Sequence, residues 1–514
     1  MVPDFKQKRP LAQVGQALAA SFLIATGTLL APAPAARAAL PTLGDGLELT
    51  AAAERKLGDR IIRELYRDPD YLDDAVLHEY LVGIFQPLRS AARARGELGA
   101  DIDERFAWEL LMGRDRTVNA FALPGGYFGV HLGLIGVTAT RDELASVLAH
   151  ELSHVTQRHI SRLIAQQGRQ TPLMIGALIL GALAASKSPD AAQALMVGGQ
   201  ALAVQNQLNF SRDMEREADR IGYGLMQPGG FAPQGFVGMF DKLQQANRIN
   251  DNGSWPYLRS HPLTTQRIAD MQSRIAHDAP RPAAASMEHL LMAARARVLM
   301  RPGQDAWRQW LDAPQDAGFA ARPARERATA WYAAALSAVQ LSDWQAARRA
   351  VAGLRDAVQG DAPAVRQARL LGAEVEMAAG APAAALAVLD EMPAAGTPGR
   401  PELVLRTQAL LRTGDAAAMT GPLQTRVATH PQDAAAWLLL AQVWRQQGQN
   451  LRAVRAEAEA QVAHHDYAAA VDRFKAGQDL ARKSAGAADY IEASIIDTRL
   501  RAVESLLREQ AAER

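Results

Sequence analysis

The chain contains no cysteine and carries no strong net charge of either sign. Without thiols it forms neither disulfides nor thiolate metal sites, so any metal must be held by nitrogen and oxygen ligands. The formal net charge of the 514 residues is +1, so the chain lacks the excess of positive charge that is typical of nucleic-acid-binding proteins. Hydrophobic residues (48%) and charged residues (22%) occur in ordinary globular proportion. This composition indicates neither a polytopic membrane protein nor a wholly disordered chain.

Long hydrophobic runs are also missing, including at the N-terminus, where the apolar run from about residue 17 to 30 is shorter than the ~20 residues of a bilayer span. It follows a basic cluster (Lys6, Lys8, Arg9) and precedes Ala36-Arg37-Ala38, a small-x-small pattern typical of signal-peptide cleavage. We predict a secretory signal over residues 1–38, with an uncleaved membrane anchor as the alternative. Removing its four basic residues and one acidic residue lowers the net charge from +1 to −2. The expected product is soluble and exported.

The most informative stretch is His150-Glu151-Leu152-Ser153-His154. Residues 141–159 contain neither Gly nor Pro and carry apolar residues at three- and four-residue steps, which predicts a helix buried on one side. Residues four apart lie on one helical face, so His150 and His154 can bind one ion while Glu151 sits beside it. Two ligands and a general base would then come from one turn of helix. The alternative is a surface helix with two solvated histidines.

Short strands are predicted upstream of this helix. Apolar segments at 106–111 and 119–130 are typical of strands, and Pro124-Gly125-Gly126 within the second segment indicates a strand pair with a tight connection. A strand that precedes a metal-binding helix can hold an extended peptide at its edge, as in many peptidases. We therefore expect Asn119, Ala120 and Phe121 to contact substrate. The alternative is that this strand only completes the sheet.

A catalytic zinc needs a third protein ligand and an open position for water, and a carboxylate oxygen suits it. The charged stretch 211–222 offers Glu215 and Asp219, four residues apart on one helical face. We predict Glu215 as the third ligand and Asp219 as the carboxylate that accepts a hydrogen bond from a ligand imidazole. The alternative is that both are solvated charges bridged to arginines of the same helix.

Two nearly uncharged segments, residues 173–185 and 191–204, lie between the motif and these carboxylates. Each segment is too short to cross a bilayer. Their composition is compatible with a buried helical hairpin, a mobile lid over the metal cleft, or a surface that contacts a membrane peripherally or an unfolded polypeptide.

Four patches together resemble one family, the gluzincin zinc metallopeptidases of the CAAX prenyl protease and HtpX type. The family's His-Glu-x-x-His motif matches His150 to His154, and its Glu-x-x-x-Asp motif matches Glu215 to Asp219. Its Asn-Ala-Phe-x-x-Pro-Gly-Gly motif matches Asn119 to Gly126. Its His-Pro patch with a downstream Arg matches His261, Pro262 and Arg267. The resemblance implies one Zn²⁺ per chain, bound by His150, His154 and Glu215, with Glu151 as general base. Membrane-embedded members of the family place transmembrane helices around this core, and in this chain only the short apolar segments 173–185 and 191–204 are candidates for such helices. The substrate class of the membrane-embedded members therefore cannot be assigned to this chain.

His261 has two candidate functions at this family position. It either donates to the oxyanion as a catalytic residue or reaches the metal and occupies the fourth position, leaving no water to activate. A structural turn histidine is the third alternative. The remaining histidines, His159 among them, show no ligand or catalytic spacing, so surface or core roles are predicted for them.

From residue 281 onward the chain becomes rich in Ala, Leu, Arg and Gln. Gly380, Gly414 and Gly448 mark helix-turn-helix corners 34 residues apart, and Ser342 marks an earlier one. This period resembles tetratricopeptide repeats, whose stacked helix pairs bind peptides or partner proteins. A plain helical bundle is the alternative. A last helix, from 487 to about 509, is expected to cap the array.

The predicted fold class is mainly α. A signal peptide (1–38) is followed by a gluzincin-type metallopeptidase domain with a small β-sheet (39–280) and a tetratricopeptide-like helical solenoid (281–514). An exported chain with a C-terminal repeat domain resembles those family members that act in the bacterial periplasm on outer-membrane protein assembly. We expect a periplasmic zinc endopeptidase that cleaves misfolded or stalled envelope proteins, with repeats that recruit clients or the outer-membrane assembly machinery. The alternatives are a chaperone or scaffold for outer-membrane protein assembly with a latent zinc site and a non-proteolytic zinc hydrolase.

Overall fold

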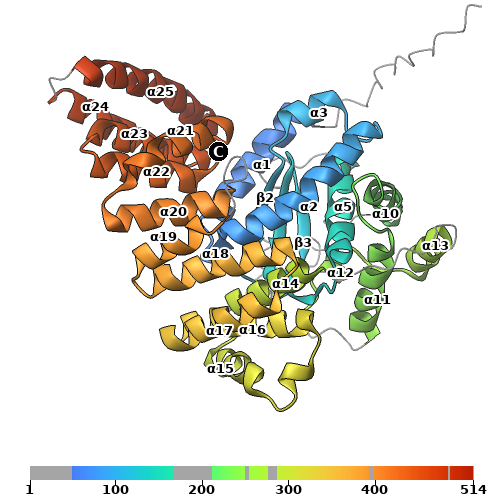
Figure 1. The fold of residues 1–514 in the computed structure, drawn as a ribbon. Coiled ribbons are helices and arrows are strands. Elements are labelled where there is room, and N and C mark those ends of the chain that lie inside the picture. Colours follow the sequence, from blue (N-terminus) through green and yellow to red (C-terminus); the bar gives the residue numbers. More distant parts are fainter. Residues whose placement is uncertain are drawn as a thin grey trace, which may run out of the picture. The chain divides into compact units, whose positions relative to one another are not determined.

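The computed structural model describes residues 49–166, 211–248, 254–275, 286–392, 399–483 and 487–512. The predicted signal peptide and the apolar segment 173–204 lie outside these residues. Residues Leu47–Arg514 belong to one compact unit, which is mostly helical with one small sheet (Figure 1). The predicted fold class is thus confirmed. None of the described helices combines the length and apolar character that crossing a bilayer requires.

The sheet has four strands in the order β1-β2-β4-β3, namely β1 (Tyr71–Leu72), β2 (Glu109–Gly113), β3 (Ala120–Leu123) and β4 (Tyr127–His131). β3 and β4 are antiparallel and paired from Leu123↔Tyr127 to Ala120↔Val130, which confirms the predicted pair with its tight connection. Gly125 and Gly126 adopt φ values of +77° and +82° in that connection, a region that L side chains avoid. β2 pairs with β4 in parallel. It begins later than the predicted strand because Trp108 has φ +54°, which interrupts the extended backbone.

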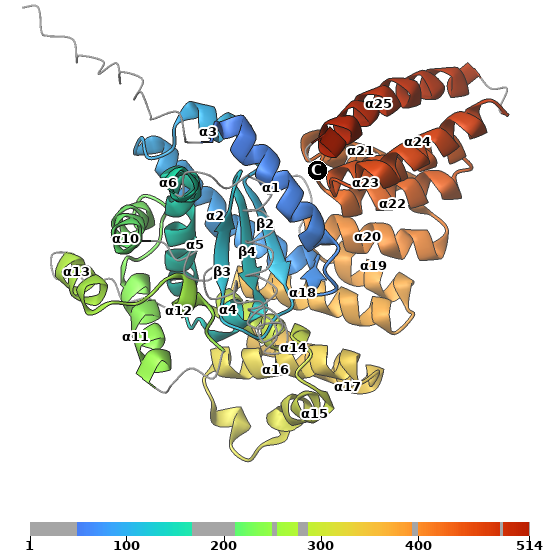
Figure 2. The same cartoon turned by 180° about the vertical axis from the view of Figure 1, so that it is seen from behind.

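Two helices cover the two faces of the sheet. α2 (Ala75–Ala94) packs on one face (Figure 1) and α1 (Ala51–Tyr66) on the other (Figure 2). Successive side chains of a strand point to opposite faces. Accordingly, the cores on the α2 and α1 faces receive alternating strand residues: Leu110, Met112, Phe128 and Val130 on the first, and Leu111, Leu123 and Tyr127 on the second.

The motif helix α5 (Arg141–Thr156) lies beside β3 and is buried from Glu143 to Thr156. It begins where the Thr140 hydroxyl accepts a hydrogen bond from the Glu143 N–H, which caps the helix. The Glu143 carboxylate accepts a further hydrogen bond from the Ala139 N–H, just before the cap. The expectation of a helix buried on one side is wrong, because α2, α10 (Arg212–Met226) and α11 (Gln234–Arg248) pack around it together with the sheet.

The remaining described helices near the sheet are α3 (Ala100–Arg105), α4 (Leu132–Val137), α6 (His159–Gln166), α12 (Tyr257–Ser260) and α13 (Thr265–Ile275). α5 and α6 do not form one continuous helix, since Arg158 between them has φ +52°. The Arg158 guanidinium pairs with Glu54 of α1 at 3.0 Å. This turn redirects the chain directly after the motif.

The C-terminal part consists of antiparallel helices: α14 (Met287–Leu299), α15 (Gln304–Asp312), α16 (Ala324–Gln340), α17 (Trp344–Ala357), α18 (Ala362–Ala378), α19 (Pro382–Asp390), α20 (Arg400–Thr413), α21 (Thr420–Thr429), α22 (Ala434–Gln446), α23 (Asn450–Ala463), α24 (Tyr467–Ala481) and α25 (Ala487–Ala512), with short 3₁₀ turns at Ala313–Gln315, Phe319–Ala321 and Ala416–Met419. The predicted corners at Gly380, Gly414 and Gly448 fall between helices and have φ values of +75°, +90° and +73°. The arrangement is compatible with a helical repeat, and its tetratricopeptide type stays a prediction.

Buried ionic contacts join the two parts. Arg295 of α14 is 5% exposed and pairs with Asp74 at the start of α2 (2.7 Å) and with Glu374 of α18 (2.8 Å). The core over α2 also runs without interruption into α14–α20. The repeat helices therefore pack directly on the helices that cover the sheet.

Candidate metal centre

Four side chains converge at the middle of α5. His150 and His154 come from α5, Glu215 from α10, and His261 directly follows α12. One nitrogen or oxygen atom from each lies within 4.8 Å of the others, and all four residues are at most 2% exposed. The structure thus brings together the four residues predicted to lie at the metal.

The spacing of these atoms suits a small ion. His150 Nε2 lies 3.0 Å from His154 Nε2 and 3.4 Å from Glu215 Oε2, and His154 Nε2 lies 3.5 Å from Glu215 Oε1. Neighbouring ligands of a tetrahedral zinc with bonds of ~2.0–2.1 Å are separated by roughly 3.3 Å. Two imidazole nitrogens and a carboxylate that face one another without exposure to solvent are also the nitrogen and oxygen donors that zinc accepts. The residues present therefore fit a zinc ion.

Glu151 is the next residue on α5 and is 1% exposed. His261 Nε2 lies 3.5 Å from its Oε1, and Tyr257 is a further hydrogen-bonding neighbour of this carboxylate. Burial raises the pKa of Glu151, an effect that the neighbouring His261 and His150 partly oppose. A buried carboxyl group with a raised pKa beside the clustered histidines suits a general base.

The helix α10 approaches α5 closely enough to deliver Glu215. A Cβ atom added at Gly222 would lie 3.1 Å from the carbonyl carbon and oxygen of Ala149, so the absence of a side chain there sets the helix separation. Asp219, one turn after Glu215, has Oδ1 2.9 Å from His150 Nδ1. This is the contact to a ligand imidazole that the sequence predicts for Asp219.

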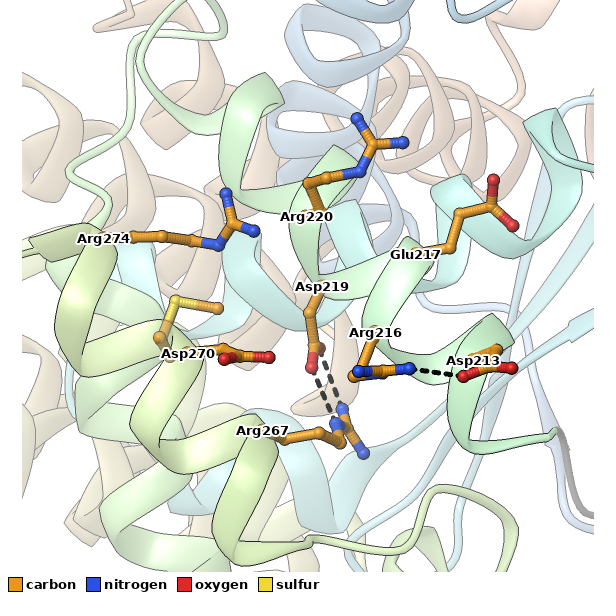
Figure 3. Close-up of a pocket in the computed structure, with 9 residues that line it drawn as sticks. Asp213, Arg216, Glu217, Asp219, Arg220, Arg267, Asp270 and Arg274 are labelled. Carbon is orange, nitrogen blue, oxygen red and sulfur yellow. Dashed lines mark hydrogen bonds and ion pairs between the residues drawn. The ribbon is translucent and has the colours of Figure 1, made fainter.

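Arg267 of α13 links the two carboxylates. Its guanidinium forms two hydrogen bonds with Asp219, at 2.6 and 2.8 Å, and lies 2.8 Å from Glu215 Oε2. Figure 3 shows the paired Arg267 and Asp219 side chains on the wall of a polar pocket between α10 and α13. Arg267 is 3% exposed, so the His-Pro patch with its downstream arginine belongs to the support of the metal site.

His154 has a second contact that the sequence did not predict. Its Nδ1 lies 2.9 Å from Nδ1 of the fully buried His159, whose Nε2 lies 3.1 Å from Glu217 Oε2. Arg162 of α6 donates to the same carboxylate oxygen at 2.9 Å. The prediction of an unrelated surface or core role for His159 is therefore incomplete, since this histidine is a direct neighbour of a candidate ligand.

His261 packs against the open side of the cluster. Its Nδ1 lies 2.9 Å from Glu215 Oε1 and 3.4 Å from His150 Nε2, and its ring stacks on Tyr257, with ring centres 4.6 Å apart. Tyr257 is a further neighbour of the site that no sequence signal indicated. These contacts make His261 the fourth member of the cluster.

The pKa values of the two α5 histidines are shifted in opposite directions. Burial lowers the pKa of His150, but the Asp219 and Glu215 carboxylates outweigh it and raise the pKa to about 9. Burial together with His150 holds the pKa of His154 well below its usual range. Burial acts to raise the pKa of Glu215, yet His261 and His150 hold it well below the usual range. Glu215 is therefore ionised, as a metal ligand must be.

β3 forms one edge of the sheet and lies next to α5. Val118, just before it, pairs with the segment leading into α12 through Ser254 and Tyr257. Asn119 is 5% exposed, and its side-chain oxygen has no hydrogen-bond partner among the residues that the structure describes. Ala120 and Phe121 form the first half of β3. The predicted substrate strand is therefore an edge strand beside the metal helix.

Comparisons with known proteins agree with this geometry. Residues 93–275 match the family model Peptidase family M48. The beta-barrel assembly-enhancing protease of Escherichia coli (strain K12) is 31% identical over 345 residues, which are 66% of this chain and 68% of that protein. The putative beta-barrel assembly-enhancing protease of Vibrio cholerae serotype O1 is 35% identical over 268 residues, so the match covers 51% of this chain and about half (52%) of that relative.

A second group of relatives matches a shorter part of the chain. The mitochondrial metalloendopeptidase OMA1 of Schizosaccharomyces pombe is 33% identical over 165 residues, which are 32% of this chain and 46% of that protein. The family match includes α5, α10 and the His261 segment, that is, all the elements that supply the clustered side chains. The chain belongs to the metallopeptidases of peptidase family M48.

Proposed function

We propose that this chain is a periplasmic zinc endopeptidase that cleaves misfolded or stalled envelope proteins. The observation that carries the proposal is the buried cluster of His150, His154 and Glu215 with the buried Glu151 carboxylate beside it. The names of the bacterial relatives, which refer to beta-barrel assembly and to a protease, support the substrate class. They also support a role for outer-membrane assembly machinery as partner.

His150, His154 and Glu215 would hold one Zn²⁺. A bound zinc ion lowers the pKa of water and polarises a peptide carbonyl. Glu151 accepts the proton of the attacking water and returns it to the leaving amine, and its raised pKa suits both transfers. The β3 edge at Asn119, Ala120 and Phe121 would hold the extended substrate by main-chain hydrogen bonds, with the free Asn119 side-chain oxygen available as an acceptor.

The contacts of His150 and His154 leave their Nε2 atoms to hold the metal, because each Nδ1 faces another side chain. If His150 and His154 coordinate through Nε2, each must carry its proton on Nδ1. His150 then donates to Asp219 and His154 donates to His159. His159, which accepts on Nδ1, must donate through Nε2 to Glu217. Asp219 and His159 are therefore positioning residues that hold the ligand tautomers.

The test uses the full chain, an unfolded outer-membrane protein as substrate and a metal chelator. We expect cleavage that the chelator abolishes, and we expect Glu151→Gln to retain zinc while it lowers the cleavage rate by about 10²–10⁴-fold. Glu104→Gln is the matched control, since Glu104 is exposed on α3. Cleavage that persists with chelator, or in the Glu151→Gln variant, would contradict the mechanism.

A chaperone or scaffold with a latent zinc site is the second candidate, and the position of His261 favours it. A histidine at the fourth position would exclude the water that the reaction needs. Replacement of His261 by Ala distinguishes the possibilities through turnover: a rise indicates a latch, a deep loss indicates a catalytic donor, and no change leaves only a structural role. If cells that produce only the Glu151→Gln variant assemble outer-membrane proteins normally, the scaffold function is favoured.

The repeat helices are proposed to recruit clients or assembly machinery, and the apolar segment 173–204 to contact the membrane peripherally. The export signal over residues 1–38 is likewise part of this proposal.

A further inference from the structure

A second strand edge lies on the side of the sheet away from β3. In the order β1-β2-β4-β3 this side is formed by β1, which has two residues and pairs only with Gly113 and Met112 of β2. The first part of β2, Glu109 to Leu111, thus has no strand partner at this edge among the described residues. Glu109 donates its N–H toward β4, to Gly126. Successive residues of a strand point their peptide groups to opposite sides, so the N–H and C=O of Leu110 face away from β4.

This open edge lines a cavity of about 440 Å³. One wall is formed by residues 107–110 and by α2, and the other by the start of α20, by the α21–α22 turn at residues 430–434 and by His464 after α23. We call this cavity the β2 groove. It is separate from the metal centre, because two strands of the sheet, β4 and β3, lie between β2 and α5.

Specific contacts fix the two walls to each other. Arg400 at the start of α20 pairs with Asp73 (2.8 Å), which lies between β1 and α2, and with Asp433 (2.9 Å) before α22. The rings of Tyr66 and His464 stack with centres 4.5 Å apart. The β2 groove is thus a built feature of the compact unit and not a loose gap between parts.

An acidic side chain, Glu109, lies at the groove and forms no ion pair among the described residues. Glu109 lines the groove and accepts a short hydrogen bond from the Tyr66 hydroxyl, but within the described residues no Lys, Arg or His forms an ion pair with it. Burial raises the pKa of Glu109 to about 7. By contrast, Asp73 and Asp433 in the same groove are each paired with Arg400. A carboxyl group that forms no ion pair, in a groove with an open strand edge, is complementary to a basic side chain on an extended chain.

We propose that the β2 groove binds an extended polypeptide segment, which adds a short strand to β2 and places a Lys or Arg side chain against Glu109. Main-chain hydrogen bonds to Leu110 would supply affinity, and the carboxylate would supply the preference for a basic residue. The open stretch from Glu109 to Leu111 accommodates about three residues of extended chain, at ~3.3 Å each. The partner is therefore a polypeptide captured at a site distinct from the one at which it is cut.

The test measures binding of a fluorescein-labelled peptide, Thr-Val-Lys-Val-Thr, to the full chain by fluorescence anisotropy. All proteins carry Glu151→Gln and chelator is present, so that neither cleavage nor metal contributes. We expect saturable binding that weakens about tenfold or more with Glu109→Gln or with Glu in place of the peptide lysine. Glu109→Gln retains an acceptor for the Tyr66 hydroxyl, and its unfolding midpoint is measured to show that the fold is kept.

Controls separate strand addition from general attraction. Glu104→Gln removes an equal charge from exposed α3 and is expected to leave binding unchanged. A peptide methylated on the central backbone nitrogens keeps its charge but loses main-chain donors, and it is expected to lose binding. The proposal is overturned if the peptide does not bind, if Glu109→Gln binds it as well as the parent does, or if backbone methylation has no effect.

Discussion

His159 provides a sharp test of how the metal site is supported. The perturbation is His159→Phe, which removes the acceptor that lies 2.9 Å from His154 Nδ1. His154 is buried, with an exposed fraction of 1%, so water cannot replace the lost partner. A buried donor without an acceptor costs about 1–3 kcal/mol. Loss of a hydrogen-bond partner behind a metal-bound histidine lowers metal affinity by about 10–100-fold. This corresponds to about 1.4–2.7 kcal/mol of binding free energy, which agrees with the cost of the unsatisfied donor.

The assay is zinc affinity, measured by competition with a chromophoric chelator on metal-free protein. We expect a 10–100-fold weaker dissociation constant for His159→Phe. His159→Asn should recover part of the affinity, because its side-chain oxygen can lie near the former Nδ1 position.

The matched control is His289→Phe. His289 is also fully buried and makes two hydrogen bonds, with the Tyr80 hydroxyl (2.7 Å) and the Thr138 carbonyl (2.9 Å), but it does not contact the cluster. Its replacement should lower stability and leave zinc affinity unchanged. The reasoning is refuted if His159→Phe binds zinc like the parent, or if His289→Phe weakens binding equally.

Three further predictions concern stability. Arg267→Ala leaves two buried carboxylates without their cation and should lower the free energy of unfolding by about 3–5 kcal/mol, measured by urea denaturation; a loss below 1 kcal/mol would contradict it. Gly222→Val places a side chain against the Ala149 carbonyl, so we expect a loss of about 1–3 kcal/mol together with weaker zinc binding, and a variant with normal affinity would show that this helix contact does not position Glu215. Two arginines lower the pKa of the buried Asp433 from 3.8 to about 2, so its stabilising contribution is present above pH 3.8 and is lost as the pH falls toward 2. The stability difference between the parent and Asp433→Asn should therefore shrink by up to about 2 kcal/mol between neutral pH and pH 2, and a difference independent of pH would refute this account.

Much of the metal centre could be predicted from local spacing. His150 and His154 lie four residues apart, as Glu215 and Asp219 do, and this spacing places each pair on one side of its helix whatever surrounds it. The β3–β4 hairpin was predictable for a similar reason, since its turn needs two glycines in adjacent left-handed positions. These features depend on interactions within a few residues of chain.

His159 escaped prediction because its role depends on a change of chain direction. It is five residues from His154 in sequence, and only the left-handed Arg158 turns α6 so that the two imidazoles face each other. Similarly, the parallel pairing of β2 with β4 depends on contacts between separate segments. No local pattern specifies such a pairing.

The sequence by itself determined the composition of the site, its nitrogen and oxygen ligands and the helical character of most of the chain, because residue chemistry and helical periodicity act over short distances. Only the tertiary structure decided which groups support the ligands, that α5 is buried on all sides, and that His261 faces Glu215. These outcomes depend on how α5, α10 and the segment after α12 pack against one another, and packing is set by the whole set of buried surfaces rather than by any one stretch of residues.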